Sequence, residues 1–182
     1  MNRNLVILAV VILGVPIGYT LRDTFESSVQ ISRTERAVGL FREYCLPYVN
    51  GTIVKPKPPL AQMRVPGEYR WADPDSEFTL SLTERTCGVS DILAPMTTDE
   101  QAQFQAAAEV VVRTEFSMLN LDKNTGLGAW DLAQVWVQFP LNDSRRWGVL
   151  MMRVVATGET TFSISFRDAG SRAERLRQTL NE

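Results

Sequence analysis

The chain has 182 residues, of which 45% are hydrophobic and 22% charged, and its formal net charge at pH 7 is −2. This composition is typical of one folded domain of about 150 residues with an additional segment, and it is unlike that of a disordered chain. The slightly negative charge argues against a nucleic-acid-binding protein. Because the sequence contains no histidine, His-based metal sites, Ser-His-Asp triads and Cys-His dyads are excluded.

An uncharged and largely apolar run occupies residues 4–21, directly after Arg3. As a helix it would be roughly 25 Å long, which is a little short of a bilayer core of about 30 Å. We therefore predict that residues 1–22 are an N-terminal membrane anchor or uncleaved signal, followed by a linker over residues 23–31. A cleaved signal is an alternative, although Gly18-Tyr19-Thr20 is a poor cleavage site; a buried helix of the soluble domain is another.

The charges around this segment bear on its orientation. Arginines are more numerous after the apolar run than before it, and counted strictly this favours a cytoplasmic domain. A short tail with one arginine nevertheless suits an export signal, and long domains translocate largely regardless of charge. We expect a single pass through a bacterial inner membrane, with the soluble domain of residues 32–182 in the periplasm.

The soluble domain is predicted to begin with a helix. Ser32 and Glu35 form the pattern of a capping box, and Pro47 is expected to end the helix. Between them, apolar residues recur at spacings of three and four, which predicts one buried helical face: Ala37, Val38, Phe41, Tyr44 and Cys45.

Residues 50–70 are rich in proline and are predicted to be an extended loop. Residues 77–84 then alternate between apolar and polar side chains, as a half-buried strand does, and residues 86–93 are its predicted partner. A second helix is predicted over residues 97–119, where Thr97 and Glu100 form another capping box.

Three further segments, residues 131–139, 146–156 and 160–168, are predicted to be consecutive antiparallel strands, and in the last of them apolar and polar side chains alternate. A short helix is predicted over residues 171–182. Together these elements predict an α+β fold, in which an antiparallel sheet of about five strands packs with two main helices, plus an N-terminal transmembrane helix.

Two acidic stretches are candidates for carboxylate chemistry. Asp73 and Asp75 lie in the sequence ADPDSE, which is also ordinary turn chemistry. Asp122 begins the sequence DKNTG, but a calcium loop requires an acidic or amide residue where Gly126 stands. We interpret both as turns and assign no catalytic, cofactor-binding or metal-binding residue.

The two cysteines, Cys45 and Cys87, are predicted to form a structural disulfide bond. They do not form the C-x-x-C motif of a redox pair, and two thiolates without histidine make a weak zinc site. In an exported domain, two cysteines on apolar faces are expected to oxidise. The alternative is two free buried thiols in a cytoplasmic domain.

Several features resemble a group of small bacterial envelope proteins and lipoproteins with no assigned chemistry. These are the apolar start, the helix that carries Phe41 and Cys45, Trp71 before a strand, and the later motif of Cys87 and Val89. The resemblance covers roughly residues 30–90, and this chain lacks the lipidation cysteine of the lipoprotein members. It implies an envelope location and no particular activity.

The sequence thus predicts a membrane-anchored envelope protein whose soluble domain binds or scaffolds a partner, with no catalysis evident and no cofactor. The expected partners are the membrane, through residues 4–21, and an envelope protein; nucleic acid is not expected. The alternative function is an enzyme that uses the loop carboxylates near Asp73 and Asp75 or near Asp122.

Overall fold

The computed structural model describes residues 31–122 and 130–180. Residues Arg33–Glu182 form one unit, whose elements, in chain order, are α2 (Arg33–Leu40), a π-helix (Phe41–Cys45), α3 (Leu46–Val49), β1 (Ala61–Val65), β2 (Glu68–Ala72), β3 (Thr79–Leu82), β4 (Thr86–Ser90), α4 (Thr98–Glu115), β5 (Asn120–Leu121), β6 (Trp130–Gln138), β7 (Trp147–Val154), β8 (Thr160–Phe166) and α5 (Arg172–Leu180).

The strands form one antiparallel sheet of eight strands in the order β1-β2-β3-β4-β8-β7-β6-β5. The prediction of about five strands is therefore wrong. Three strands of the described structure were not predicted. Two of them, β1 and β2, lie in the segment predicted as a proline-rich loop, and the third is the two-residue β5. The outermost strand β1 is largely exposed, so it lacks the apolar alternation that identifies a half-buried strand.

The strand order divides the sheet into two halves of the same plan. In each half a helical segment is followed by four strands, and the halves meet where β4 pairs with β8. If β1 to β4 are exchanged with β5 to β8, the strand order is the same when it is read from the opposite edge of the sheet. An approximate twofold axis between β4 and β8 requires this relation. The repetition of helix and strands along the sequence thus has a counterpart in the topology of the sheet.

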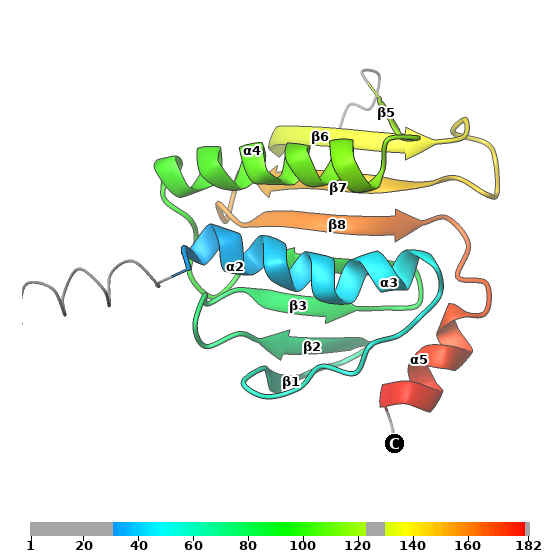
Figure 1. The fold of residues 1–182 in the computed structure, drawn as a ribbon, viewed down its shortest axis with the longest axis horizontal. Helices are drawn as coiled ribbons and strands as arrows, with labels where there is room; N and C mark the ends of the chain where they lie inside the picture. The colour runs from blue at the N-terminus through cyan, green and yellow to red at the C-terminus, as the bar shows by residue number, and fades with distance from the viewer. Residues whose placement is uncertain (1–30, 123–129, 181–182) are drawn as a thin grey trace, which may run out of the picture. The chain divides into compact units, whose positions relative to one another are not determined.

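The helical segments α2–α3 and α4 lie on the same face of the sheet (Figure 1). Phe41 of the π-helix contacts Phe162 of β8 with ring centroids 4.1 Å apart, and Phe104 of α4 lies 6.1 Å from the same ring. Because side chains alternate along a strand, the neighbours of Phe162 in β8 point to the opposite face. The core therefore lies between the helices and one face of the sheet.

The first helical arm continues past the position where the sequence analysis ends it. The chain widens into a π-helix at Phe41–Cys45 and then resumes as α3, in whose first turn Pro47 lies. Proline is tolerated there because the first turn of a helix needs no N–H donor from that position. The prediction that Pro47 ends the helix is wrong for this reason, whereas the capping box of Thr97 and Glu100 at the start of α4 is confirmed.

The predicted transmembrane helix is not part of the described structure. No helix among residues 31–122 and 130–180 is both long and apolar enough to cross a membrane. The predicted anchor of residues 1–22 and most of the linker of residues 23–31 lie outside the described residues.

The last helix, α5, is attached to the end of α3 by two arginines. The Arg172 guanidinium donates to the Val49 carbonyl oxygen at 3.2 Å, and that of Arg175 donates to the Gly51 carbonyl oxygen at 2.7 Å. These carbonyls follow the last turn of a helix, where acceptors lack intrahelical partners and positive charge is favourable. The contacts place the C-terminal segment at the end of the sheet where β8 finishes.

Two glycines provide a matched test of how tightly this sheet is packed. A Cβ atom at Gly88 of β4 would lie 2.5 Å from Cβ of Ser163 in β8, whereas one at Gly39 in α2 would meet nothing within 4 Å. We expect Gly88→Ala to destabilise the domain by about 1–3 kcal/mol through overpacking. Gly39→Ala is expected to stabilise it by about 0.5–1 kcal/mol, because glycine is unfavourable inside a helix. Chemical denaturation of both variants measures the difference, and equal effects would contradict it.

Candidate functional site

A groove with a volume of about 480 Å³ opens on the face of the sheet opposite α2–α3 and α4. This volume lies within the range of about 300–1,000 Å³ that ligand pockets usually have. We call it the open-face groove. Its lining residues are Val135, Val137, Leu141, Asn142, Arg146, Trp147, Gly148, Leu150, Ser165, Phe166 and Arg167.

The floor of the open-face groove follows from the register of three strands. Val135 and Val137 of β6 pair with Leu150 and Gly148 of β7, and Gly148 pairs with Ser165 of β8. These five residues lie on the face of the sheet that points away from the helices, because their neighbours along each strand face the core. The result is an apolar floor on a face that an antiparallel sheet usually presents to water.

Gly148 lies where the backbones of β6 and β7 come close together. A Cβ atom at this position would lie 2.3 Å from the Trp136 carbonyl oxygen and 2.9 Å from Cγ1 of Val137. No side chain therefore fits there without a shift of the backbone, so glycine is required where β6 and β7 approach each other.

One wall of the groove is the loop that connects β6 and β7. Within it, Asp143 accepts hydrogen bonds from the backbone N–H and the guanidinium of Arg145, at 2.8 Å and 2.7 Å respectively. These hydrogen bonds lower the pKa of the Asp143 carboxyl to about 2. Leu141 in the same loop is 71% exposed. The loop thus combines a fixed ion pair with a large apolar side chain that projects into solvent.

The other arginines of the groove differ in their partners. Arg146 donates to Asp122 Oδ2 at 3.0 Å and to the Phe139 carbonyl oxygen at 2.9 Å. Arg167 donates to the Leu141 carbonyl oxygen. Within the described part of the chain, no carboxylate lies within ion-pair distance of Arg167. Arg167 therefore contributes a positive charge at the rim; it interacts electrostatically with Asp143, but Arg145 already binds that carboxylate directly.

The structure separates the two acidic stretches that the sequence analysis singled out. Asp73 lies at the turn after β2, and Asp122 follows β5 in the other half of the sheet. Asp122 forms an ion pair with Arg146, and Asp75 is exposed. The rest of the predicted DKNTG turn lies outside the described residues. The carboxylates of the two stretches do not converge on one site.

Asp73 has a structural role. Its side chain is fully buried, and Arg36 of α2 donates to both carboxylate oxygens, at 3.1 Å and 3.2 Å, while Ser76 Oγ donates to Oδ2 at 2.6 Å. Burial alone would raise the pKa of Asp73, but the hydrogen bonds and charge of Arg36 and Ser76 outweigh it and lower the pKa. A carboxylate that stays ionised and has donors on both oxygens joins α2 to the β2–β3 turn.

Replacing Asp73 by asparagine tests this role. We expect Asp73→Asn to lower the free energy of unfolding at pH 7 by about 1–3 kcal/mol, because the Arg36 guanidinium loses its charged acceptor. Since the folded-state pKa of Asp73 is lowered, its stabilisation is present above the unfolded pKa of about 3.9 and is lost as the pH falls through the folded value. The variant should therefore lose less stability than the wild type on acidification below about pH 4. Denaturation curves between acidic and neutral pH measure this.

Asp75→Asn is the matched control for this experiment. Asp75 is exposed and only two residues away, so its replacement should change stability by less than about 0.5 kcal/mol. A loss in Asp75→Asn equal to that in Asp73→Asn would contradict a structural role specific to Asp73.

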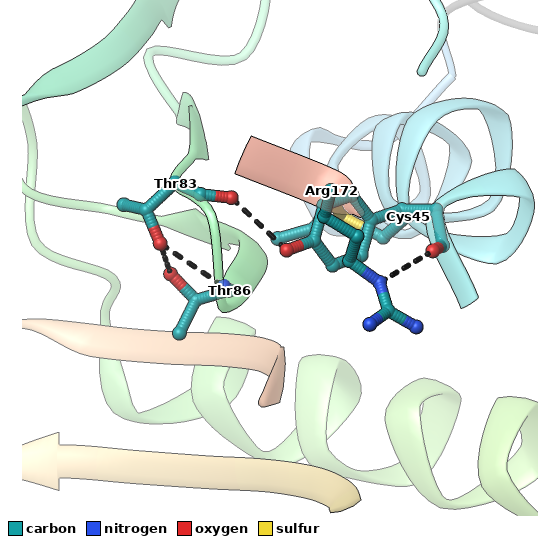
Figure 2. The surroundings of a disulfide bond; sticks show 6 residues. Cys45, Thr83, Thr86 and Arg172 are labelled. Carbon is teal, nitrogen blue, oxygen red and sulfur yellow. Dashed lines mark hydrogen bonds between the residues drawn. A yellow bond between two sulfur atoms is a disulfide. The ribbon is translucent and has the colours of Figure 1, made fainter. Parts of the chain in front are cut away.

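The structure joins Cys45 and Cys87 in a disulfide bond, with Cα atoms 5.4 Å apart, as the sequence predicts. Both residues are fully buried. Figure 2 shows Cys45 on its helix close to Arg172 and to the turn that contains Thr83 and Thr86. The bond therefore ties the π-helix to β4 in the interior of the domain.

The neighbourhood of this bond is held by polar contacts of the β3–β4 turn. The Tyr48 hydroxyl donates to the Thr83 carbonyl oxygen at 3.0 Å, and the hydroxyls of Thr83 and Thr86 are 2.7 Å apart (Figure 2). Burial raises the pKa of Tyr48, so its hydroxyl stays protonated and remains a donor. Nothing in this arrangement exposes a reactive group.

Two other shallow cavities occur in the described structure. One lies beside α5 and the β3–β4 turn, and is lined in part by Arg85, Leu176 and Arg177. The other lies between α4 and the β5–β6 edge, where the Gln134 amide donates to Glu109 at 3.1 Å. The second of these cavities also has apolar lining residues, among them Val112, Leu119 and Leu121.

Among the described residues, no group of three or more cysteine, aspartate or glutamate side chains is arranged to hold a metal ion. The residues of the open-face groove were not identified by the sequence analysis. Both β6 and β7 were predicted as strands, but the sequence of a strand does not tell which of its faces the helices leave uncovered.

Comparison of the chain with known protein families, curated proteins and solved structures found no match.

Proposed function

We propose that this protein is an envelope protein whose soluble domain binds a protein partner through the open-face groove. The observation that carries the proposal is the apolar floor of Val137 and Leu150, which are only partly buried, on the face opposite the helices and next to the exposed Leu141. Exposed apolar surface rimmed by polar residues is typical of an interaction site. An anchor such as Leu141 is the kind of side chain that a partner would bury.

The environment of the carboxylates supports binding rather than catalysis. A general acid or base works best with a pKa near the working pH, whereas the pKa values of Asp73 and Asp143 are lowered. Asp122 beside the groove is paired with Arg146. These acids have fixed partners that hold elements of the fold together, so the enzyme alternative gains no support from them.

The proposed location is the periplasmic side of a bacterial inner membrane. A buried disulfide bond in a chain with no other cysteine suits an oxidising compartment. Residues 4–21 remain the segment that we expect to direct the chain to the membrane. Sequencing the N-terminus of the protein recovered from cells tests whether this segment is retained, and a protein that starts between residues 18 and 28 would contradict retention.

Photo-crosslinking in intact cells tests the proposed function. Leu141 is replaced by the photoreactive residue p-benzoylphenylalanine, and the 61% exposed Val155 in the β7–β8 turn serves as the control position. We expect a defined crosslinked protein from position 141 and none from position 155, because only the former lies in the groove.

A second substitution gives this experiment its specificity. Val137→Asp places a charge on the apolar floor of the groove, on the solvent-facing side of β6, and should abolish the crosslink from position 141. Circular dichroism establishes whether the variant folds, and Val137→Ala serves as a milder change if it does not. A crosslink that persists in a folded Val137 variant, or that forms equally from position 155, would contradict the proposal.

A further inference from the structure

We propose that the open-face groove recognises an acidic, apolar segment of its protein partner. In this arrangement an apolar side chain of the partner rests on Val137 and Leu150, and an adjacent carboxylate pairs with Arg167. The inference rests on the proposed function and adds to it the chemistry of the bound segment and a residue that determines specificity.

The rim of the groove has an unbalanced positive charge. Arg145 and Arg146 are held by Asp143 and Asp122 through ion pairs of 2.7 Å and 3.0 Å. Arg167 is exposed and donates only to the Leu141 carbonyl oxygen among the contacts described. Since a guanidinium has five N–H donors in a fixed fork, Arg167 retains donors that a carboxylate can accept in a bidentate manner.

The same sign of charge extends over the whole end of the sheet to which the groove belongs. Residues 83–85, 139–146 and 167–180, together with Asp122, include seven arginines and five acidic residues. The turns at the other end of the strands, residues 73–78, 91–100 and 155–159, contain seven acidic residues and no lysine or arginine. Arg36 and Arg33 of α2 pair with two of these acids, Asp73 and Glu100, and the other five acids leave that end negative. An acidic segment would therefore be attracted to the groove end rather than to the opposite end.

The shape of the groove sets the size of the apolar group. Val137, Gly148 and Leu150 form the floor of the groove, and Ser165 lines it on the side of β8. Leu141 stands on the wall, on the same loop as the ion pair of Asp143 and Arg145. A branched aliphatic side chain with a carboxylate beside it combines the two groups that this apolar floor and the guanidinium of Arg167 can bind.

Methyl NMR of the full-length chain in lipid nanodiscs tests the inference with small probes. N-acetyl-leucine carries the isobutyl group and a carboxylate, N-acetyl-leucinamide is its neutral counterpart, and leucinamide is cationic. We expect N-acetyl-leucine to shift the methyl signals of Val137 and Leu150 at millimolar concentration. The neutral amide should bind about threefold more weakly, since an exposed ion pair contributes up to about 1 kcal/mol, and leucinamide more weakly still.

Two variants decide whether Arg167 is responsible for this preference. Arg167→Gln should remove the difference between the acid and the amide, whereas Arg42→Gln, which makes the same charge change at an exposed site on the π-helix, should preserve it. Equal binding of acid and amide by the wild type, a preference that survives in Arg167→Gln, or no shift of the groove methyls would overturn the inference. Because crosslinking from Leu141 is a separate measurement, a positive crosslink with no carboxylate preference would overturn this inference alone.

Discussion

Replacing both Cys45 and Cys87 by alanine is expected to lower the free energy of unfolding by about 4 kcal/mol. The sequence separation of the two cysteines is 42 residues, and closing a loop of about that length removes this much chain entropy from the unfolded state. The loss is a large share of the roughly 5–15 kcal/mol by which a typical protein is stable. For a unit of this size it should lower the melting temperature by about 8–16 °C.

Unfolding of the wild type with and without reductant distinguishes the effect of the bond from the effect of the alanine substitutions. Reductant added to the folded protein should act slowly, because both sulfurs are fully buried. Reductant added to the unfolded protein should reproduce the loss seen in the double alanine variant. A reduced wild type as stable as the oxidised one would contradict a stabilising role for the bond.

Thiol alkylation relates the bond to the proposed compartment. Protein taken directly from cells, unfolded without reductant, should remain unlabelled at both cysteines if the domain folds in an oxidising compartment. Labelling of both would show that the thiols are free in cells, and it would favour a cytoplasmic domain and the reversed topology.

Phe162→Ala is expected to destabilise the domain by about 3–5 kcal/mol, the usual cost of removing a buried phenylalanine. Phe162 is fully buried in the central strand β8 and contacts Phe41 and Phe104, which belong to the two helical segments. The cavity would therefore open where both helices meet the sheet. Phe162→Leu retains most of the side-chain volume and should cost less.

Equilibrium denaturation with urea measures both variants. Comparison of the midpoints at an unchanged slope gives the loss of stability. A loss below about 1 kcal/mol for Phe162→Ala would mean that the site collapses around the alanine, and would contradict a rigid core at this position.

Local patterns in the sequence were sufficient to predict several helices and strands. Alternation identified β3 and β8, and the capping box at Thr97 identified the start of α4. Such patterns are reliable when one face of an element is buried and the other exposed, because burial then imprints the period of the element on the sequence. The exposed edge strand β1 carries no such imprint.

The sequence alone predicted part of the core and the bond between Cys45 and Cys87, which the structure contains, and it excluded histidine chemistry. Only the tertiary structure decided that β4 meets β8, that Arg146 pairs with an aspartate 24 positions away, and that the helices leave the floor of Val137 and Leu150 uncovered. Alternation states that two faces differ, but it cannot state which one the helices cover. That choice depends on contacts between segments far apart in the chain, so the candidate site became visible only once those segments were brought together.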